Sequence, residues 1–456
     1  MKVLRAQAVV FLLSASLVCI AVGCEKTHPA PSSPHVVLIS VDTLRADHLG
    51  CYGYFRPTSP RLDRFVEECV KFERAETPIN QTLPAHASML SSVLPREHGA
   101  VGNRFKINTG TPLLAPVLSA NGYETMAVLA AAPLDSEFGL ARGFDVYEDT
   151  SDKGLSLGTN RPRTGDEVVE VVRAVTKGRD NIRPLFLFVH FWDTHNPYFS
   201  TKKSRKYFEH TEELDKIVEE RNAKEFSWNR INKYDSAVRA LDGWLFDLLE
   251  YLEDEGILDH ALIIITSDHG EGLGQHDYWG HGEYLYEQET WVPLIVRMPG
   301  GERGGRSVGT RVSTIDIAPT VYEFLGIDMP RGVVGTSLIH AINGDAKPPE
   351  KDVIIERRWW APNYKSQPVP GELSDSFAVV RDNWKYIWHS KDSDELYDLA
   401  ADPFEMNNLI KDEPEKAMAL LKIIKEHRDK VGPMPTEPPQ ISEKAKKNLK
   451  ALGYID

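Results

Sequence analysis

The sequence predicts an α/β fold with a large, mostly parallel central sheet, helices on both faces of that sheet, and a small antiparallel sheet near the C-terminus. Nearly continuous apolar runs of strand length alternate with helical patterns along most of the chain. Such runs are typical of strands covered on both faces, and their alternation with helices favours a parallel sheet. After about residue 345 the pattern changes to short strands separated by turn residues, which is typical of an antiparallel sheet.

Five apolar runs are the expected strands of the central sheet, at residues 35–42, 125–131, 185–191, 261–268 and 292–297. Helical patterns lie near residues 60–70, 83–93, 164–177, 229–252 and 316–325. The C-terminal part is expected to hold the small sheet, a helix around residues 413–428, and a short amphipathic helix in the tail at 444–454.

The N-terminus has the pattern of a secretory signal, because Lys2 and Arg5 precede an apolar run that ends in small residues. The segment Ala-Val-Gly-Cys ending at Cys24 resembles a bacterial lipobox, in which that cysteine is acylated. Plain cleavage and an uncleaved anchor are the alternatives. We expect a signal peptide at 1–23, a tether at 24–34, a main domain at 35–345 and a C-terminal subdomain with its tail at 346–456. The chain is thus expected in a bacterial cell envelope, held to the membrane by lipid on Cys24, on the periplasmic or extracellular face.

The composition is that of a globular protein, with 456 residues, 41% hydrophobic and 26% charged. The formal net charge is -14 and no long basic run occurs, which argues against nucleic-acid binding. Cys51 and Cys69 follow the signal segment and Cys24. They could pair in an oxidising compartment, and the sequence leaves that open.

Polar residues follow two of the expected strands at their carboxyl ends. Asp42 ends the first strand, and Asp268 with His269 ends the strand at 261–268. A single Asp at a strand end is usually a turn former. Carboxyl ends of parallel strands share one edge of the sheet, however, so these three residues are expected to converge. Two carboxylates and an imidazole suit a divalent cation.

The segment NQTLPAHASML at 80–90 places Thr82 where a helix begins. Thr82 fits the N-cap position, and Pro84 fits the first turn. A helix N-terminus also binds anions. Beside a metal ion, the Thr82 hydroxyl could act as a nucleophile, so this residue is expected to serve as cap, as nucleophile, or as both.

Several segments, taken in order, resemble the sulfatase family of the alkaline phosphatase superfamily over about residues 35–410. They are VDTLRADHLGCYG, TLPAHASMLSSVLPREHG, DTHNPY, SDHGEGLGQHDYWGHG and ELYDLAADPFEMNNL. The resemblance implies the fold described above, a metal ion in the site and an activity on sulfate or phosphate esters.

The chain departs from ordinary sulfatases at four places. Thr82 stands where they have a Cys or Ser that becomes formylglycine, and His86 replaces their motif Arg. Thr43 replaces one of a pair of Asp ligands, and LAAAPLD at 129–135 replaces a Gly-Lys-Trp-His segment. The Thr-x-Pro-x-His motif resembles that of nucleotide pyrophosphatase/phosphodiesterases, and Asn103 falls where those enzymes place an Asn that contacts the phosphoryl oxygen. Phosphoethanolamine and lipoteichoic-acid transferases also use a Thr with one metal ion.

These resemblances imply the roles of the candidate site residues. The implied metal ligands are Asp42, Thr82, Asp268 and His269, and the implied catalytic residues are Thr82, His195, His281 and Asn103. One divalent cation is expected, and Ca²⁺, Mn²⁺, Mg²⁺ and Zn²⁺ stay open. His276, Asp193 and Glu271 are candidate ligands of a second metal ion, but the spacing of dinuclear relatives is absent. His86 and His98 are expected to be structural.

The expected function is metal-dependent hydrolysis of sulfate or phosphate esters, mono- or diesters, through Thr82. The alternatives are a transferase of phospho-headgroups and a non-catalytic metal-binding protein with the sulfatase fold. The expected partner is an anionic ester, on a glycan or a lipid headgroup. A basic segment at 202–206 and the aromatic residues Trp359 and Trp360 are candidate contacts for such a substrate.

Overall fold

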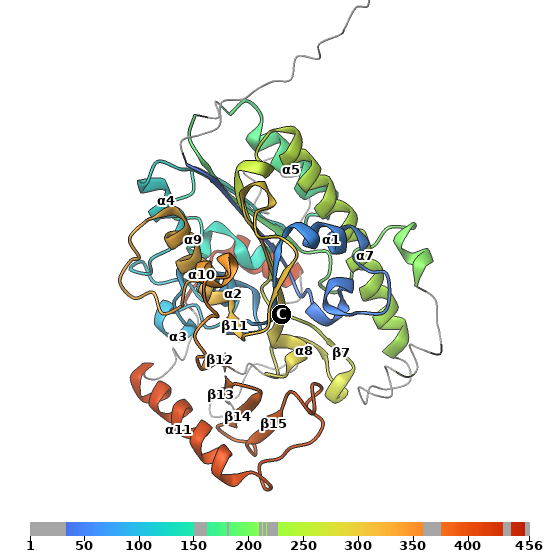
Figure 1. Cartoon of the computed structure of the whole chain (residues 1–456), viewed down its shortest axis with the longest axis vertical. Coiled ribbons are helices and arrows are strands. Elements are labelled where there is room, and N and C mark those ends of the chain that lie inside the picture. Colours follow the sequence, from blue (N-terminus) through green and yellow to red (C-terminus); the bar gives the residue numbers. More distant parts are fainter. Residues whose placement is uncertain are drawn as a thin grey trace, which may run out of the picture.

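The computed structural model describes residues 33–149, 162–179, 182–208, 212, 216, 227–358, 375–431 and 439–451. A nine-stranded sheet runs through the centre of the molecule (Figure 1). From one edge to the other its strands are β10 (Arg306–Val308), β2 (Val70–Glu76), β9 (Trp291–Arg297), β6 (Ala261–Ser267), β1 (His35–Val41), β5 (Leu185–Phe191), β3 (Glu124–Val128) and β4 (Val146–Glu148), with β11 (Val312–Ser313) paired to β2.

Most neighbouring strands of this sheet are parallel. The run from β6 through β1, β5 and β3 to β4 is parallel throughout, whereas β9 is antiparallel to both of its neighbours, β6 and β2. The expectation of a large, mostly parallel sheet is therefore confirmed. The five expected strands are β1, β3, β5, β6 and β9.

Helices cover both faces of the sheet, as expected (Figure 1). One face carries α1 (Pro60–Phe65), α5 (Gly165–Thr176) and α7 (Ser227–Asp254). The other carries α2 (Thr82–Ser91), α4 (Leu114–Ala120), α9 (Ile317–Leu325) and α10 (Ile339–Asn343). The short helices α3 (Pro95–His98) and α8 (Glu287–Thr290) lie in connections.

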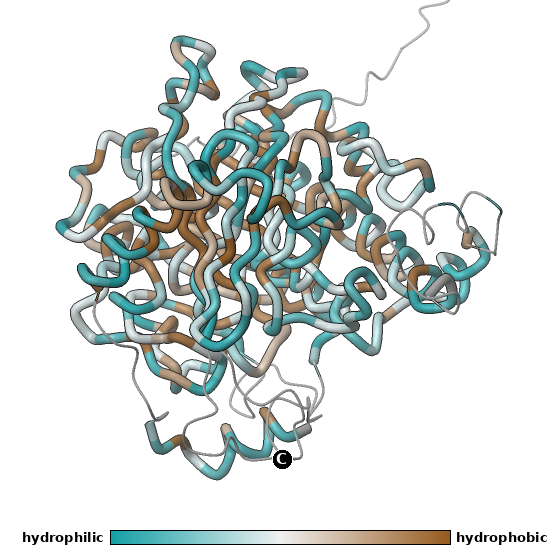
Figure 2. The backbone as a smooth tube through the Cα atoms, turned by 90° about the horizontal axis from the view of Figure 1, so that it is seen from below, coloured by the Kyte–Doolittle hydropathy of each residue, from teal (hydrophilic) through white to brown (hydrophobic). Residues whose placement is uncertain are grey.

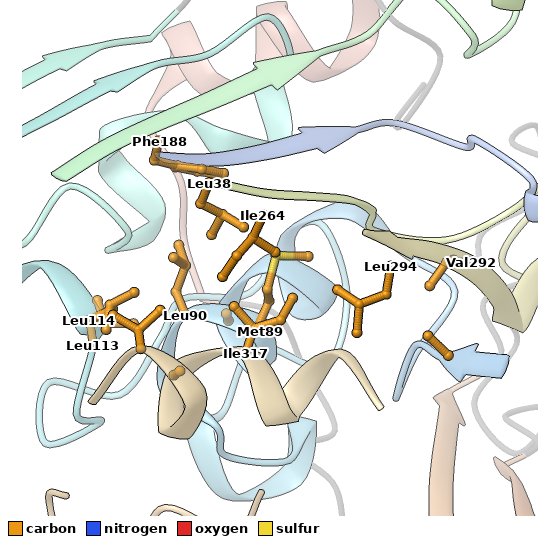
Figure 3. Packing of buried hydrophobic residues seen from close by; sticks show 14 of the residues in the cluster. Leu38, Met89, Leu90, Leu113, Leu114, Phe188, Ile264, Val292, Leu294 and Ile317 are labelled. Carbon is orange, nitrogen blue, oxygen red and sulfur yellow. The ribbon is translucent and has the colours of Figure 1, made fainter. Parts of the chain in front are cut away.

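Alternate residues of the central strands face the two helical layers, which gives two hydrophobic cores. Leu38, Phe188 and Ile264 come from three neighbouring strands and pack over Met89 of α2 (Figure 3). Val37, Leu187 and Ile263 point the other way, toward α5 and α7. Figure 2 shows the hydrophobic segments gathered in the interior around these strands. Burial on both faces explains why these strands read as continuous apolar runs.

The small C-terminal sheet is antiparallel, as expected, with the order β12 (Val353–Arg358), β13 (Asp375–Arg381), β14 (Trp384–His389) and β15 (Glu395–Asp398). Helix α11 (Pro414–Val431) packs on β13 and β14. The expected tail helix is α12 (Glu443–Ala451), which packs on the short 3-10 helix η4 (Ala132–Leu134) at the end of β3. A two-stranded ribbon joins β7 (Gly272–Leu273) to β8 (Trp279–Gly280).

One expected helix is wrong in extent. The pattern at 60–70 ends as α1 and a 3-10 turn at Glu68, and β2 begins at Val70. Strand β2 has mixed burial along Val-Lys-Phe-Glu-Arg-Ala-Glu, because it lies near an edge of the sheet, so it lacks an apolar run.

Among the described residues, no helix is long and apolar enough to cross a membrane. Cys51 and Cys69, whose pairing the sequence leaves open, are free thiols.

A buried lysine joins the C-terminal sheet to the main sheet. Lys385 of β14 is fully buried, and its Nζ lies 3.1 Å from Glu287 Oε1 of α8 and 3.0 Å from Glu405 Oε1. The same ammonium donates a hydrogen bond to Thr290 Oγ1. Charges in such an environment need partners, because each is far from water.

Replacing Lys385 by Met would leave Glu287 and Glu405 buried without this cation, although Arg311 still lies 3.5 Å from Glu287. We expect a loss of about 3–5 kcal/mol of stability, measured from the midpoint of urea unfolding. Lys422→Met is the matched control, since Lys422 forms an exposed pair with Glu426 and should change stability by less than about 1 kcal/mol. Equal midpoints for the two variants would show that the buried lysine does not hold the sheets together.

Candidate active site

The carboxyl ends of β1 and β6 bring three candidate metal ligands together. These strands are parallel neighbours with Val41 opposite Ser267, so the residues that follow, Asp42 and Asp268, leave the sheet side by side. His269 Nε2 lies 3.6 Å from Asp268 Oδ2 and 3.9 Å from Asp42 Oδ1. In the described part of the chain, these three residues are the one group whose ligand atoms all lie within 4.8 Å of one another.

The atoms that face each other in this group have no hydrogen-bond partner among the described residues. They are Asp42 Oδ1 and Oδ2, Asp268 Oδ2 and His269 Nε2, all buried. The opposite atoms are held: Asp268 Oδ1 accepts hydrogen bonds from the amides of Thr43 and His269. His269 Nδ1 donates to the carbonyl of Gly270, so Nε2 presents a lone pair. Buried polar atoms normally have partners, and this donor set fits one divalent cation.

The electrostatics of the site agree with that fit. Burial raises the pKa of Asp42 well above its usual value, and the neighbouring Asp268 and Glu271 raise it further. Burial also raises the pKa of Asp268, to about 6. Burial lowers the pKa of His269 to about 3, which keeps its imidazole neutral and able to bind a cation. A positive charge beside the two carboxylates would therefore favour their ionised forms.

Thr82 is the first residue of α2, and its expected role as the N-cap is wrong. Gln81 occupies the cap position, and the Thr82 hydroxyl is buried with no hydrogen-bond partner in the described structure. Asn103 supplies the cap, because its Oδ1 accepts the amide hydrogen of Leu83 at 2.8 Å. The Thr82 hydroxyl is thus left without a structural task, which leaves its role as a nucleophile or ligand as a prediction.

His86 lies between the start of α2 and Asp268. Its Nδ1 donates to the Thr82 carbonyl at 2.7 Å and lies 3.8 Å from Asp268 Oδ2. Its Nε2 meets Ser40 Oγ, which also contacts His190 Nδ1. His86 and His98 are both buried and hydrogen-bonded within the fold, as expected for structural residues.

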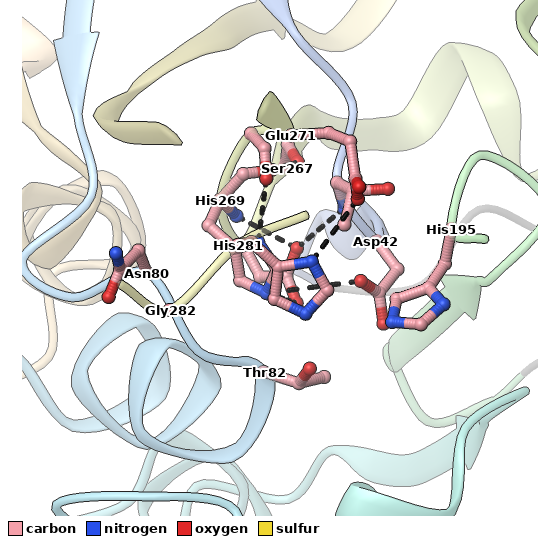
Figure 4. A network of polar contacts seen from close by, with 12 residues as sticks. Asp42, Asn80, Thr82, His195, Ser267, His269, Glu271, His281 and Gly282 are labelled. Carbon is pink, nitrogen blue, oxygen red and sulfur yellow. Dashed lines mark hydrogen bonds and ion pairs between the residues drawn. The ribbon is translucent and has the colours of Figure 1, made fainter. Parts of the chain in front are cut away.

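Figure 4 shows His195 beside Asp42, His281 close to His269, and Thr82 below these residues. The rings of His195 and His281 are 4.9 Å apart, and the His281 ring is 4.5 Å from that of His269. Burial lowers the pKa of His195 to about 3 and that of His281 to about 4, so both rings are neutral in the free protein. His195 Nδ1 donates to the Asn196 carbonyl, and His281 Nδ1 donates to Glu271 Oε2 at 3.2 Å.

The three candidates for a second metal site do not form one cluster. Asp193 accepts the amide hydrogen of Gly165 at the start of α5, and His276 contacts the carbonyl of Phe404. Glu271 instead accepts a hydrogen bond from His281.

The basic residues at 202, 203, 205 and 206 are exposed on and beside a 3-10 helix at Ser204–Tyr207. The signal segment, Cys24, Trp359 and Trp360 lie outside the described residues.

Two polar residues of this site are not predicted by the sequence analysis. Ser40 and His190 lie opposite each other on β1 and β5, inside runs that are otherwise apolar, and both contact the network of His86. A polar residue near the carboxyl end of a buried strand is the signal that would have found them.

The family model of the sulfatases matches residues 34–327, and that of the N-sulphoglucosamine sulphohydrolase C-terminal region matches residues 274–430. An arylsulfatase of Clostridium perfringens is 26% identical over 84% of this chain and 91% of its own. An N-acetylglucosamine-6-O-sulfatase of Bacteroides thetaiotaomicron is 23% identical over 82% of each chain.

The solved structure of a phosphonate monoester hydrolase of Agrobacterium radiobacter has the same fold. It superposes with a TM-score of 0.71 and 20% identity over 90% of this chain and 98% of its own. The sulfatase family model spans more than half of the chain and includes Asp42, Thr82, Asp268 and His269. The chain therefore belongs to the sulfatase family, within the alkaline phosphatase superfamily.

Proposed function

We propose that the chain hydrolyses sulfate or phosphate esters, mono- or diesters, in a metal-dependent reaction with Thr82 as the nucleophile. The observation that carries the proposal is the Thr82 hydroxyl itself. It is buried at the start of α2, makes no hydrogen bond to any described residue, and belongs to a helix whose His86 lies 3.8 Å from Asp268 Oδ2.

Asp42, Asp268, His269 and Thr82 would hold one divalent cation. When bound, the cation would balance the two carboxylates, act as a Lewis acid and lower the pKa of a neighbouring hydroxyl. The ligand set contains oxygen and one imidazole nitrogen, which suits Ca²⁺, Mn²⁺, Mg²⁺ or Zn²⁺.

The residues of the chain divide the remaining work. Thr82 Oγ attacks the phosphorus or sulfur atom in line with the leaving group, so the Thr82 ester forms as the bond to the leaving oxygen breaks, and the hydroxyl proton passes to that oxygen. The partial positive charge at the N-terminus of α2 favours the negative charge of the ester oxygens. Asn103 uses its oxygen to cap α2, which leaves its amide nitrogen to donate to one of those oxygens. His195 and His281 contact the ester and move protons.

The substrate class is an anionic ester on a glycan or a lipid headgroup. Two relatives point to the range of chemistry in the family, since one is named for a sulfated sugar and another for phosphonate monoesters. Thr82 cannot become formylglycine, which favours phosphoric esters. We also propose that lipid on Cys24 anchors the chain in a bacterial envelope, on the strength of the lipobox-like sequence.

Replacing Thr82 by Ala should abolish turnover of nitrophenyl sulfate, phosphate or bis-phosphate, with a fall in kcat of at least about 1000-fold. Thr82→Ser is the matched control, since it keeps a hydroxyl and should keep part of the activity. The Ala variant should fold normally, because Thr82 Oγ1 makes no hydrogen bond within the described structure. Full activity in Thr82→Ala would show that Thr82 is not the nucleophile.

Removing divalent cations with a chelator should abolish activity and lower the melting temperature. A ligand at 100 times its Kd stabilises the folded state by about 2.7 kcal/mol. The stabilisation by added Mn²⁺, Zn²⁺, Ca²⁺ or Mg²⁺ should disappear in Asp268→Asn, because Asp268 Oδ2 faces the other ligands. An equal cation-dependent shift in the parent and in Asp268→Asn would place the cation elsewhere.

A further inference from the structure

His281 lies in a short connection between two glycines, whose conformational freedom would by itself leave the connection flexible. Gly280 and Gly282 flank it with φ angles of +119° and +92°, a region that favours glycine. Two buried carboxylates hold this connection. Glu289 accepts the amide hydrogen of Gly282 and also a hydrogen bond from Asn80, which precedes the Thr82 helix. Glu271 holds the His281 imidazole itself.

Glu271 is fixed on several sides. It is 1% exposed, and its Oε1 accepts a hydrogen bond from the Tyr198 hydroxyl at 3.3 Å. The guanidinium of Arg230 lies 3.7 Å from the same oxygen. Arg45 donates to the Glu271 backbone carbonyl at 2.9 Å. The second carboxylate oxygen of Glu271, Oε2, lies 3.2 Å from His281 Nδ1 (Figure 4).

This contact sets the tautomer of His281. A carboxylate only accepts, so Nδ1 carries the hydrogen and the neutral ring has a lone pair on Nε2. A proton taken up by Nε2 would create an imidazolium directly beside the Glu271 carboxylate, which stabilises it. His195 differs, because its Nδ1 donates to the neutral backbone carbonyl of Asn196. Of these two rings, His281 is the one whose Nδ1 contacts a carboxylate, so the geometry favours it as the proton acceptor.

We propose that Glu271 is a positioning residue that holds His281 as the general base for the water that hydrolyses the Thr82 ester. This inference rests on the proposed function and deepens it. With water as the acceptor, the group leaves as free sulfate or phosphate.

In the hydrolysis of the Thr82 ester, the water oxygen attacks the phosphorus or sulfur atom, while one water proton passes to His281 Nε2. The new bond joins this oxygen to phosphorus or sulfur, and the bond from Thr82 Oγ to that atom breaks. The imidazolium then gives its proton to the departing Thr82 oxygen, which restores the hydroxyl and the neutral ring.

The test compares formation and breakdown of the Thr82 ester in the parent, Glu271→Gln and His281→Asn. The probe is the nitrophenyl ester that the parent hydrolyses fastest. Stopped-flow absorbance gives the burst of nitrophenolate and the steady rate, and mass spectrometry of the acid-quenched protein finds the group on the Thr82 peptide. Glu289→Gln is the matched control, since Glu289 is a buried carboxylate that contacts the same connection but not the imidazole.

In Glu271→Gln and His281→Asn we expect the steady rate to fall by about 100- to 10,000-fold, with a burst close to one nitrophenolate per chain and an accumulated Thr82 ester. In Glu289→Gln any loss should affect burst and steady rate alike, because the backbone contact serves both steps. A merely structural Glu271 would give the same result as Glu289, so a proportionate loss without accumulated ester would overturn the proposal.

The outcomes separate this proposal from the proposed function. Turnover in the parent that Thr82→Ala abolishes, combined with a proportionate loss in Glu271→Gln, would overturn the role of Glu271 alone. Absence of turnover in the parent would overturn both. With glycerol added as acceptor, the parent should still release mainly free sulfate or phosphate, and dominant transfer to glycerol would contradict a base that serves water.

Discussion

The carboxyl groups of Asp42 and Asp268 lie buried beside each other at the edge of the central sheet, and the rest of the site depends on how their charge is balanced. Burial and mutual repulsion disfavour two carboxylates so close together. Two imidazole nitrogens lie near the carboxylates: His269 Nε2 is 3.6 Å from Asp268 Oδ2, and His190 Nε2 is 3.6 Å from Asp42 Oδ2. Burial lowers the pKa of both rings, so they are neutral and add no positive charge. A divalent cation among Asp42, Asp268 and His269 would remove the conflict and would give a partner to their inward-facing atoms.

The fold produces this arrangement through one property of parallel sheets. Neighbouring parallel strands deliver the residues that follow them to the same edge, so β1 and β6 bring two aspartates together, and β5 leads toward His195. The helix that starts with Thr82 then closes the site from the side of the first hydrophobic core, where Met89 packs beneath Leu38 and Ile264. The position of the hydroxyl thus follows from packing far from the reacting atoms.

Much of this could be predicted from the sequence, where a feature depends on residues near each other in the chain or on strand ends. Asp42, Asp268 and His269 were predictable because each ends a continuous apolar run. The capping of α2 was not, since the side chain that caps it belongs to Asn103, which lies on a separate loop. Strand β2 was missed because its burial is mixed. The contact of Glu271 with His281 depends on how the connection around β7 and β8 folds back, which spacing alone does not specify.

Anomalous X-ray scattering from crystals of the protein soaked in Mn²⁺ tests most directly whether a cation binds between the two carboxylates and Thr82. One strong peak is expected, bounded by the inward-facing atoms of Asp42, Asp268 and His269 and within coordination distance of the Thr82 hydroxyl. A peak bound elsewhere, or one that leaves Thr82 outside the coordination sphere, would contradict the proposed metal site.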